Sequence, residues 1–382
     1  MISFALTEEQ EILRQTARKF AQNEIVPVAA QYDIEGTFPL DVAQKAFDAG
    51  LIYDIIPEQY GGPGVSYVDS CIVNEELAAG CAGITTTLMA NSLAVTPLLL
   101  VGTEEQKKRF LPPLCEKLTF AAFCLTEAGA GSDVSAVATT AVRDGDHYVI
   151  NGTKQFITNG GLADLFTVFA STDKSKGARG ISAIVVRKDE TPGVSTGKKL
   201  DKMGQRASNQ TEVIFEDARV PVENRLGNEG DGFKIAMMTF DRTRAIVAAV
   251  SVGVARAAFE YAREYSKERV QFGMPLAAMP TIQFALSDMA IKISAARLLT
   301  WHAAWLADQG VRQSNEAAFA KAFAADSAME ITTQTVQIFG GYGYSKEYPV
   351  EKLMRDAKLL QIYEGTSEIQ RVVIARGILK GK

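Results

Sequence analysis

A long apolar stripe in the last third of the chain restricts the fold more than any other feature of the sequence. No proline, which would end or kink a helix, occurs between Pro221 and Pro275. Within that interval apolar residues recur at the spacing of one helix face: Phe233, Met237, Phe240, Val247, Val250, Val254, Ala258, Tyr261 and Tyr265. The stripe predicts one helix of about 40 residues, roughly 60 Å long.

Further helical patterns follow the stripe and predict a bundle. They cover residues 281–309 and 315–339, each of which ends at a glycine. A last helix is expected after Glu364. Four antiparallel helices that cover one another's apolar faces would form a C-terminal four-helix bundle over residues 228–382.

The first part of the chain, residues 1–120, is also predicted to be helical, because its apolar residues recur at three and four. Thr7 followed by Gln10 has the pattern of a capping box, and Pro27 is expected to bend or end the first helix. Breaks rich in glycine and proline separate the later helices. An N-terminal helical domain is therefore expected.

Between these blocks, over residues 121–227, the apolar period changes to two. β-branched and aromatic residues gather in short runs that predict strands: residues 147–150, 165–170, 181–186 and 212–215. Asp144-Gly145, Asn151-Gly152 and Asn159-Gly-Gly161 are predicted to form tight hairpin turns. A small antiparallel β-domain is expected here, so the chain as a whole is predicted to have an α+β fold of three domains.

Charge and composition exclude several classes of function. The 382-residue chain has a net charge of -5, and its 40 basic and 45 acidic residues form no basic stripe that would bind nucleic acid. His147 and His302 have no partners at metal-ligand spacing, so no metal site is expected. No stretch reaches the roughly 20 apolar residues of a membrane-spanning helix, so no membrane span is expected.

The cysteines and the N-terminus indicate the compartment. The four cysteines are widely spaced and form no CxxC pair, which is typical of reduced thiols. The N-terminal residues lack the basic and apolar regions of a signal peptide. A cytoplasmic protein is expected, or a protein of an organellar matrix if the chain is a processed form.

Two glycine-containing segments have residue types suited to a cofactor, although each has an ordinary structural explanation. The segment Leu125-Thr-Glu-Ala-Gly-Ala-Gly-Ser-Asp133 could approach a planar, hydrogen-bonding cofactor, or it could be an exposed turn. The segment Phe339-Gly-Gly-Tyr-Gly-Tyr344 could offer backbone amides to phosphate oxygens, or it could simply end a helix. No GxGxxG within a βαβ unit occurs, so a Rossmann domain is not expected.

Glu364 and a serine motif raise opposite expectations. Glu364 precedes a helix start among apolar residues, where desolvation would raise its pKa and suit it to act as a base; a surface glutamate is the alternative. Gly193-Val-Ser-Thr-Gly197 matches the letters of a nucleophile elbow. It follows a turn and precedes two lysines, instead of joining a strand to a helix, so a serine hydrolase is not expected.

Taken in order, these segments resemble the acyl-CoA dehydrogenase family from end to end, and the medium-chain, straight-chain type most closely. The resemblance is carried by eight segments: Asn91-Ser-Leu93, Thr126–Asp133, Ile150–Gly160, Phe240-Asp-Arg-Thr-Arg244, Arg269-Val-Gln-Phe-Gly273, Gln337-Ile-Phe-Gly-Gly341, Tyr348–Asp356 and Gln361–Gln370. The family's order of helical, β and helical domains agrees with the three blocks above.

The resemblance implies FAD bound between the β-domain and the C-terminal helices. The residues that would contact the flavin are Phe123, Leu125, Thr126, Phe156 and Thr158, with Ser132 where FAD and CoA meet. A second set would contact the FAD of a neighbouring subunit: Arg269, Phe272, Gln337, Gly340 and Gly341. Thr366 and Glu368 would return to the first subunit's FAD. Such sharing implies a homotetramer built as a dimer of dimers.

The resemblance also implies an acyl-CoA substrate and a mechanism. The CoA and thioester side would involve Ser132, Asp241, Arg244 and Gly365, and the acyl tail would meet Thr86, Met89, Ala90 and Tyr363. Glu364 would remove an α-proton while the β-hydride passes to FAD, which gives a trans-2-enoyl-CoA of fatty acid β-oxidation. The electrons would pass to electron-transferring flavoprotein. Some relatives carry the base at the position of Thr243, with glycine or alanine at the position of Glu364.

Other functions stay open at this stage. An acyl-CoA oxidase that uses oxygen, or a dehydrogenase of branched or aromatic acyl-CoA, would share the fold, although the usual oxidases are much longer. A non-catalytic scaffold is disfavoured because Glu364 and the flavin-loop residues occur together. Met279 and Pro280 depart from the family's pattern, so the adenine contacts near them cannot be carried over.

Overall fold

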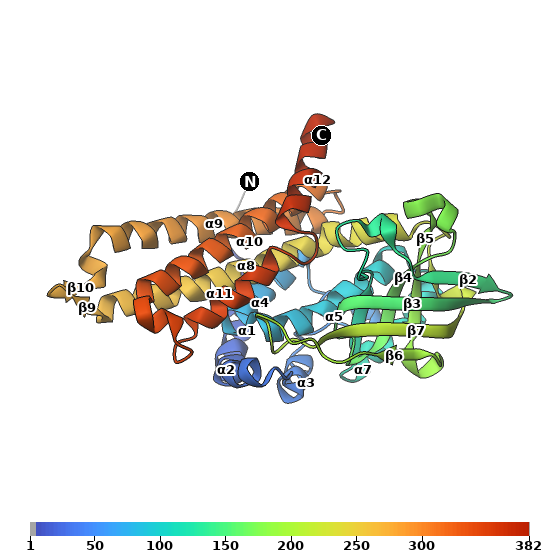
Figure 1. Cartoon of the computed structure of the whole chain (residues 1–382), viewed down its shortest axis with the longest axis horizontal. Coiled ribbons are helices and arrows are strands. Elements are labelled where there is room, and N and C mark those ends of the chain that lie inside the picture. The colour runs from blue at the N-terminus through green and yellow to red at the C-terminus, as the bar shows by residue number, and fades with distance from the viewer. Residues whose placement is uncertain (1–4, 382) are drawn as a thin grey trace.

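The computed structural model describes residues 5–381, which form three regions. Figure 1 shows the sheet at one end of the molecule and the long C-terminal helices extending from it to the other end, with N-terminal helices packed along their side. The division proposed from the sequence, at residues 120/121 and 227/228, stays a prediction. The nearest changes of element type are the start of β1 at Phe120 and the start of α8 at Gly232.

The N-terminal region is helical, with these helices: α1 (Glu8–Phe20), α2 (Val26–Glu35), α3 (Leu40–Asp48), α4 (Tyr67–Gly80), α5 (Ala82–Val101), α6 (Glu104–Phe110) and α7 (Pro112–Glu116). The predicted capping box is confirmed, because the Thr7 hydroxyl accepts from the Gln10 amide and the Gln10 side chain accepts from the Thr7 amide. A π-helical turn, Ala21–Ile25, joins α1 to α2. Pro27 therefore lies directly after the π-helical turn, a local change in the helical hydrogen bonds of the kind that proline commonly accompanies.

The middle region is a mainly antiparallel sheet in the order β6-β7-β3-β2-β4-β5-β8, with β1 paired to β4. Its strands are: β1 (Phe120–Cys124), β2 (Thr140–Asp144), β3 (His147–Thr158), β4 (Ala163–Ser171), β5 (Ile181–Arg187), β6 (Val194–Thr196), β7 (Gln210–Pro221) and β8 (Arg225–Leu226). Two pairings are parallel: β1 with β4, and a single residue pair between β2 and β4. Each of the four predicted runs lies within one of these strands.

One predicted turn is wrong. Asn151-Gly152 lies inside β3, where the register with β7 shifts between Ile150 and Gly152. Gly152 has a φ of 150°, and a Cβ there would come within 2.4 Å of the Thr139 hydroxyl oxygen. The glycine therefore permits a close approach of two chain segments at a bulge, not a hairpin turn. Ser195 of the GxSxG segment lies within β6, opposite Ile214, so it does not occupy a strand-to-helix elbow.

The C-terminal region contains the three predicted long helices, followed by two shorter ones: α8 (Gly232–Glu268), α9 (Pro280–Asp308), α10 (Ser314–Phe339), α11 (Val350–Leu360) and α12 (Ser367–Leu379). The apolar stripe forms α8, 37 residues long, which packs against α4, α9 and α10. A short hairpin, β9 (Val270–Gln271) and β10 (Met274–Pro275), joins α8 to α9. Helix α11, which begins directly after Pro349, is not among the helices predicted from the sequence.

Two helices reach the length and apolar character of a membrane span, contrary to the expectation from the sequence. They are α5 and α8, and 72% and 78% of their most apolar windows are buried inside the protein. Core helices of a globular protein meet the same criterion because they too are apolar on all sides. The two helices are therefore weak evidence for a membrane, and their place in the fold is the core.

Candidate active site

The loop between α11 and α12 holds Glu364 in an unusual backbone conformation. Glu364 has a φ of 51° and Gly365 a φ of 89°, so both lie in the left-handed region. Arg244 Nε donates to the Glu364 carbonyl at 3.3 Å. Gln370 Nε2 donates to the Glu364 carbonyl at 3.2 Å and to the Gly365 carbonyl at 2.9 Å. Lys321 Nζ donates to the Gly365 carbonyl at 2.7 Å. A residue such as glutamate costs about 1–3 kcal/mol in this conformation, and these side chains offset that cost.

The carboxylate of Glu364 is directed at α8. Thr243 Oγ1 donates to Glu364 Oε2 at 2.7 Å. Burial raises the pKa of Glu364, and this effect outweighs the hydrogen bond from Thr243 and the positive charges of Arg244 and Lys321, which lower it. A carboxylate with a raised pKa binds a proton more tightly, which a general base for a weak carbon acid requires.

Arg244 and Asp241 lie one turn apart on α8, and Arg244 lies beside Glu364. Arg244 is 4% exposed, and its Nη1 lies 3.8 Å from the Asp241 carboxylate. Burial raises the pKa of that carboxylate, which also accepts a hydrogen bond from Ser314. The guanidinium carbon lies 5.6 Å from the centroid of the Phe240 ring. Arg244 also donates to the loop that carries Glu364, and its contact with CoA stays a prediction.

Aromatic rings connect the base to the sheet. The ring of Phe240 lies 5.5 Å from that of Phe123 on β1, measured between centroids, and Phe123 lies 4.7 Å from Phe169 on β4. Phe240 therefore contacts both Phe123, a predicted flavin contact, and Arg244, which holds the base loop. The sheet edge and the base loop meet at the junction of the sheet with the bundle.

The sheet edge at this junction offers hydrogen-bonding groups and an exposed ring. Phe156 on β3 has a φ of 58° and is 56% exposed, and Leu125 is buried beside this edge. Thr126 and Thr158 are partly exposed and Ser132 is exposed; within residues 5–381 their hydroxyls make no hydrogen bond to the protein. Free hydroxyls beside an exposed aromatic ring fit a planar, hydrogen-bonding cofactor such as a flavin.

The second predicted set of cofactor residues lies at the opposite end of the bundle. Phe272, in the hairpin, is 91% exposed, and Arg269 lies 5.5 Å from the ring centroid of Tyr342. The end of α10 brings the remaining members of the set to the same region: Gln337, Gly340 and Gly341. Figure 1 shows the hairpin and the sheet at opposite ends of the molecule. One chain therefore does not bring the two sets together.

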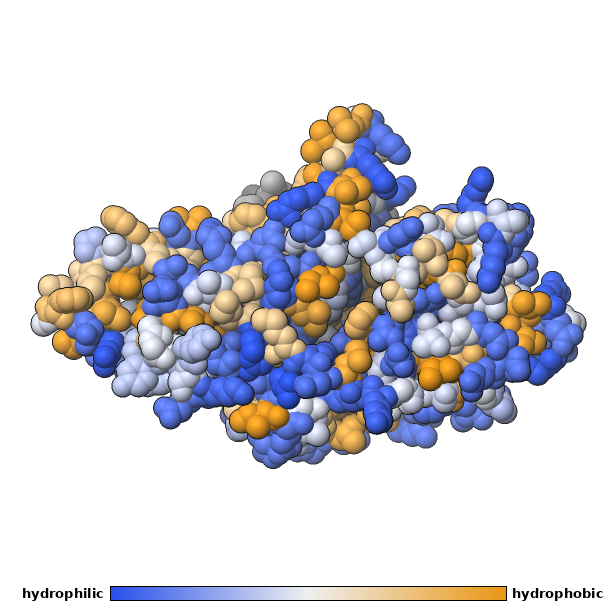
Figure 2. Space-filling view, in the orientation of Figure 1, coloured by the Kyte–Doolittle hydropathy of each residue, from blue (hydrophilic) through white to orange (hydrophobic). Residues whose placement is uncertain are grey.

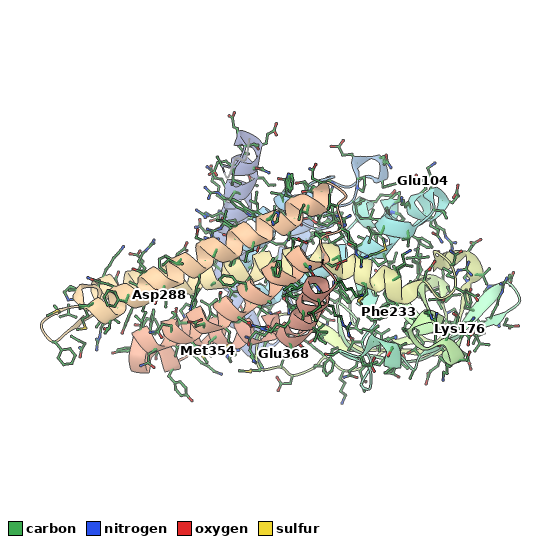
Figure 3. The ribbon with its side chains drawn as sticks, turned by 90° about the horizontal axis from the view of Figure 1, so that it is seen from above. Glu104, Lys176, Phe233, Asp288, Met354 and Glu368 are labelled. Carbon is green, nitrogen blue, oxygen red and sulfur yellow. The ribbon has the colours of Figure 1, made fainter. Side chains whose placement is uncertain are left out.

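Thr366 and Glu368 lie directly after the base, at the start of α12. The Thr366 hydroxyl accepts from the Ile369 amide at 3.2 Å and caps the helix. Glu368 is exposed in the first turn, and Figure 3 shows it between the hairpin end of the bundle and the sheet. Both residues lie next to Glu364 in the chain, and their contact with the first subunit's FAD stays a prediction.

On the other side of Glu364, Tyr363 lies beside polar groups of α5 and of the loop before β7. Thr86 Oγ1 donates to Gln205 Oε1 at 2.8 Å. The buried Tyr363 hydroxyl lies near both side chains without forming a hydrogen bond of good geometry. Met89 and Ala90 are buried on α5, 8% and 5% exposed. The predicted end of the acyl tail site thus contains polar groups.

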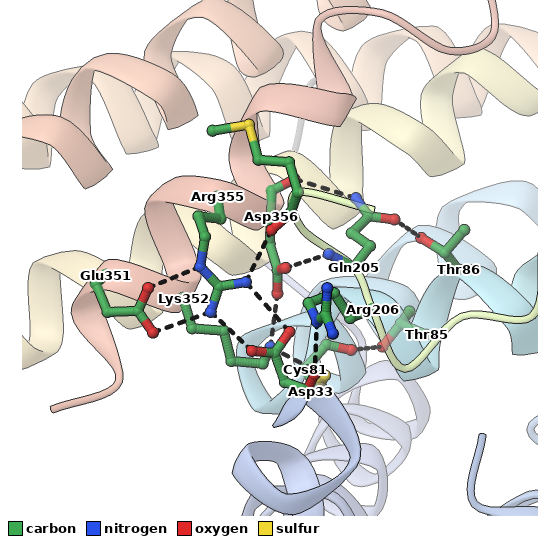
Figure 4. Close-up of polar contacts among 11 residues, drawn as sticks. Asp33, Cys81, Thr85, Thr86, Gln205, Arg206, Glu351, Lys352, Arg355 and Asp356 are labelled. Carbon is green, nitrogen blue, oxygen red and sulfur yellow. Dashed lines mark hydrogen bonds and ion pairs between the residues drawn. The ribbon is translucent and has the colours of Figure 1, made fainter. Parts of the chain in front are cut away.

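A buried polar cluster fixes Gln205 and joins the three regions of the chain (Figure 4). The Gln205 amide donates to the Asp356 carboxylate, and Gln205 Nε2 donates to the Asp356 carbonyl at 3.2 Å. Lys352 pairs with Asp356 at 2.6 Å, and Arg355 pairs with Asp33 of α2 at 2.7 Å. Gln205 therefore has little freedom to move when a neighbouring group changes.

Sequence reasoning missed three residues that hold this site: Lys321, Gln370 and Gln205. Lys321 left a signal, because it is the lone charged residue in an alanine-rich stretch, residues 317–325, that the helix buries. Gln370 and Gln205 left none, since a glutamine in a helix or loop is ordinarily exposed.

A helical domain, a β-domain and a helical bundle in this order, with a partly buried carboxylate where bundle and sheet meet, define a class of flavoprotein dehydrogenases. Models of the acyl-CoA dehydrogenase N-terminal, middle and C-terminal domains match residues 7–117, 122–218 and 230–379. The chain belongs to the acyl-CoA dehydrogenase family, as the resemblance predicted, and FAD is the cofactor of that family.

Similar proteins span the whole chain. It is 47% identical over 380 residues to the short-chain specific acyl-CoA dehydrogenase of Clostridium acetobutylicum, covering 99% of this chain and 100% of that one. Butyryl-CoA dehydrogenase from Megasphaera elsdenii has a TM-score of 0.96 at 46% identity, covering 99% and 100%. A chain in the structure of electron transferring flavoprotein of Acidaminococcus fermentans has a TM-score of 0.96 at 48% identity. The match covers 99% of this chain and 100% of that one.

Proposed function

We propose that this protein is an FAD-dependent acyl-CoA dehydrogenase that converts a short- to medium-chain acyl-CoA to the trans-2-enoyl-CoA in fatty acid β-oxidation. The observation that carries the proposal is the partly buried Glu364 carboxylate, which has a raised pKa and lies beside a sheet edge suited to a flavin. Two similar proteins are named for short-chain or butyryl-CoA substrates, which favours the shorter end of the range.

The chain's own residues move the proton and hold the thioester. Glu364 takes the α-proton of the acyl group. Its backbone amide donates no hydrogen bond within residues 5–381, so it can donate to the thioester oxygen and stabilise the charge that develops there. Bound FAD supplies the acceptor for the β-hydride. Phe240 and Phe123 pack together at the junction and help to keep water from the reacting carbons.

The electron acceptor is proposed to be electron-transferring flavoprotein, because one similar chain occurs in a structure of such a protein. An oxidase that reduces oxygen is the alternative. A direct test bleaches the purified yellow holoenzyme with butyryl-CoA without oxygen, then reoxidises it either with electron-transferring flavoprotein or with air. Fast reoxidation by the flavoprotein and slow reoxidation by air supports the proposal. A holoenzyme that no acyl-CoA bleaches contradicts dehydrogenation itself.

We expect kcat/KM to rise with acyl chain length and then to fall sharply within a range of about four to ten carbons. Each buried methylene contributes about 0.8 kcal/mol, or roughly fourfold in affinity, until the tail meets the end of its site. Met89 can fold into that space and shorten it, so Met89→Ala should move the maximum to longer chains. A series of straight-chain substrates measures this. A preference for a branched or aromatic acyl-CoA over every straight chain would contradict the tail site.

The assembly is proposed to be a homotetramer. Large apolar side chains recur every seven residues on one exposed face of α9: Phe284, Ile291, Leu298 and Trp305, which are 43–68% exposed. Residues seven apart lie on one side of a helix, so they form a stripe that a second copy can cover. Figure 2 shows further apolar surface at the projecting end of α12, where Ile378 and Leu379 are exposed.

Arg269→Ala is expected to weaken FAD retention without unfolding the chain, because Arg269 would contact the FAD of a neighbouring subunit. FAD content after gel filtration, together with the mass from light scattering, measures the effect. Arg263→Ala, which removes an exposed arginine in the last turns of α8, is the control and should keep its FAD. A stable, fully flavinated monomer would contradict the shared site.

A cytoplasmic location, or an organellar matrix, remains part of the proposal. The cysteines, Cys71, Cys81, Cys115 and Cys124, are free thiols in the structure. Such thiols persist in reducing compartments. The proposal includes no nucleic-acid partner, because the chain has a net charge of -5.

A further inference from the structure

Lys321 on α10 is a fully buried cation without a close counter-ion. Its exposure is 0%, and within residues 5–381 its Nζ forms no ion pair closer than 4.0 Å. Its hydrogen bond goes to the carbonyl of Gly365 at 2.7 Å. Burying a charge without a partner costs several kcal/mol, so a stable core alone gives no reason for a lysine here. A perturbed cation beside the base loop indicates a functional role.

We propose that Lys321 is a positioning residue for the reaction: its ammonium group fixes the Gly365 carbonyl and thereby holds the left-handed loop that aims Glu364 at the substrate. The inference rests on the proposed dehydrogenase function and deepens it. In this role Lys321 acts through the loop and needs no contact with the substrate or the cofactor.

The geometry of the peptide bond explains how a carbonyl contact orients the base. In a trans peptide the carbonyl and the following N–H point in opposite directions. Arg244, Gln370 and Lys321 hold the carbonyls of Glu364 and Gly365 on the side of the bundle, so the next amides point away from it. The amides of residues 364, 365 and 366 donate no hydrogen bond within the described chain. These backbone donors are therefore available to an oxyanion.

The charge of Lys321 supports the same role. Burial lowers the pKa of Lys321 to about 8, while the nearby carboxylate of Glu364 raises it. In return, the cation lowers the pKa of Glu364 against the effect of burial. The other charged groups that act on Lys321 are Arg244 of α8, Asp326 of α10 and Glu368 of α12. Removing the cation therefore leaves Glu364 with a still higher pKa, so the base becomes ionised only at higher pH.

The test separates removal of the α-proton from hydride transfer. The probe is a CoA thioester with sulfur at the β position, which has α-hydrogens and no β-hydrogen. Exchange of its α-hydrogens with deuterated buffer is followed by NMR in the FAD-loaded enzyme. In Lys321→Met we expect the exchange rate near neutral pH to fall about 10- to 100-fold, because the base is misplaced. The rising limb of its pH profile should move to higher pH.

Three measurements exclude a merely structural role. Lys321→Met should keep its FAD content, and it should bind the probe with a Kd within about threefold of the parent, because Lys321 contacts neither ligand. Lys321→Arg, which keeps a cation and a donor, should restore most of the exchange. Lys358→Met removes an exposed lysine of α11 and should leave the exchange rate and its pH profile unchanged.

The outcomes distinguish this inference from the proposed function. No exchange and no bleaching in the parent enzyme would contradict the dehydrogenase itself. Exchange in the parent with an unshifted pH profile in Lys321→Met would overturn the role of Lys321 alone. Should Lys321→Met lose its FAD, Lys321→Gln takes its place, since it keeps a neutral donor and loses the charge. A shifted profile in that variant supports the inference, and an unshifted one overturns it.

Discussion

Glu364→Gln is expected to lower the rate of flavin reduction by butyryl-CoA by a factor on the order of 10³, while the variant folds and binds FAD. The amide has the size of the carboxylate and can still accept the hydrogen bond that Thr243 donates at 2.7 Å. It cannot take up the α-proton at neutral pH. Asp326, another carboxylate in contact with the loop, already accepts hydrogen bonds from Gln361, Ser367 and Arg371, so we do not expect it to replace the base.

Single-turnover bleaching without oxygen measures this effect directly, since it does not depend on the electron acceptor. FAD content and the melting temperature should match those of the parent chain. Glu347→Gln, which removes an exposed carboxylate before α11, is the matched control and should reduce its flavin at the parent rate. Near-parental bleaching by Glu364→Gln would sink the assignment of the base.

The second large effect is expected on stability. Glu127→Ala should lower the free energy of unfolding by about 3–5 kcal/mol, because it leaves Lys154 charged and without its partner in the core. Lys154 is 0% exposed and lies 2.6 Å from the Glu127 carboxylate. That carboxylate also accepts the amides of Ala138 and Thr139 at 2.7 and 3.0 Å. Three groups therefore lose a partner in one substitution.

This effect depends on pH with a definite sign. Burial alone would raise the pKa of Glu127, but Lys154 and the hydrogen bonds outweigh burial and bring the pKa below its usual value. A carboxylate with a lowered pKa stabilises the fold above its unfolded pKa, and this contribution is lost as the pH falls through the folded value. The difference in the free energy of unfolding between the parent and Glu127→Ala should therefore be largest near neutral pH and should decrease in acid.

Denaturant and thermal unfolding of the holoenzyme measure this second effect. Glu216→Ala, an exposed position on β7, should change the stability by at most about 0.5 kcal/mol. Glu127→Ala should also release FAD more readily than the parent. Its partner Lys154 donates a hydrogen bond to the carbonyl of Leu125 at 3.1 Å and so supports the sheet edge. An unchanged unfolding midpoint for Glu127→Ala would show that the buried pair contributes nothing net.

The elements that repeat one pattern over many residues could be predicted from the sequence. The apolar stripe from Phe233 to Tyr265 predicted α8, because a pattern repeated over many helical turns outweighs single residues that depart from it. The capping box at Thr7 was read correctly because its hydrogen bonds are local. Asn151-Gly152 was not, since the same dipeptide serves a turn or a bulge and only the approach of Thr139 decides between them.

The site could be predicted where the type and the neighbouring sequence of a single residue indicate its function. Glu364 was predicted to be the base because it precedes a helix start among apolar residues, which is unusual for a glutamate, and because the chain resembles the family. Lys321 and Gln205 escaped because their partners, Gly365 and Asp356, are distant in sequence, and only the fold brings them together. The roles of the flavin and substrate residues stay predictions.

The contact between Thr243 and Glu364 bears on how such enzymes diverge. The two side chains meet at 2.7 Å, although one belongs to α8 and the other to the loop after α11. A carboxylate on either backbone could therefore serve the same reacting carbon, and a glycine at 364 would relieve the left-handed strain of that residue. A lineage can thus pass the base from one segment to the other while the reaction stays in place. Some relatives in the family have this arrangement, with the base at the position of Thr243 and glycine or alanine at the position of Glu364.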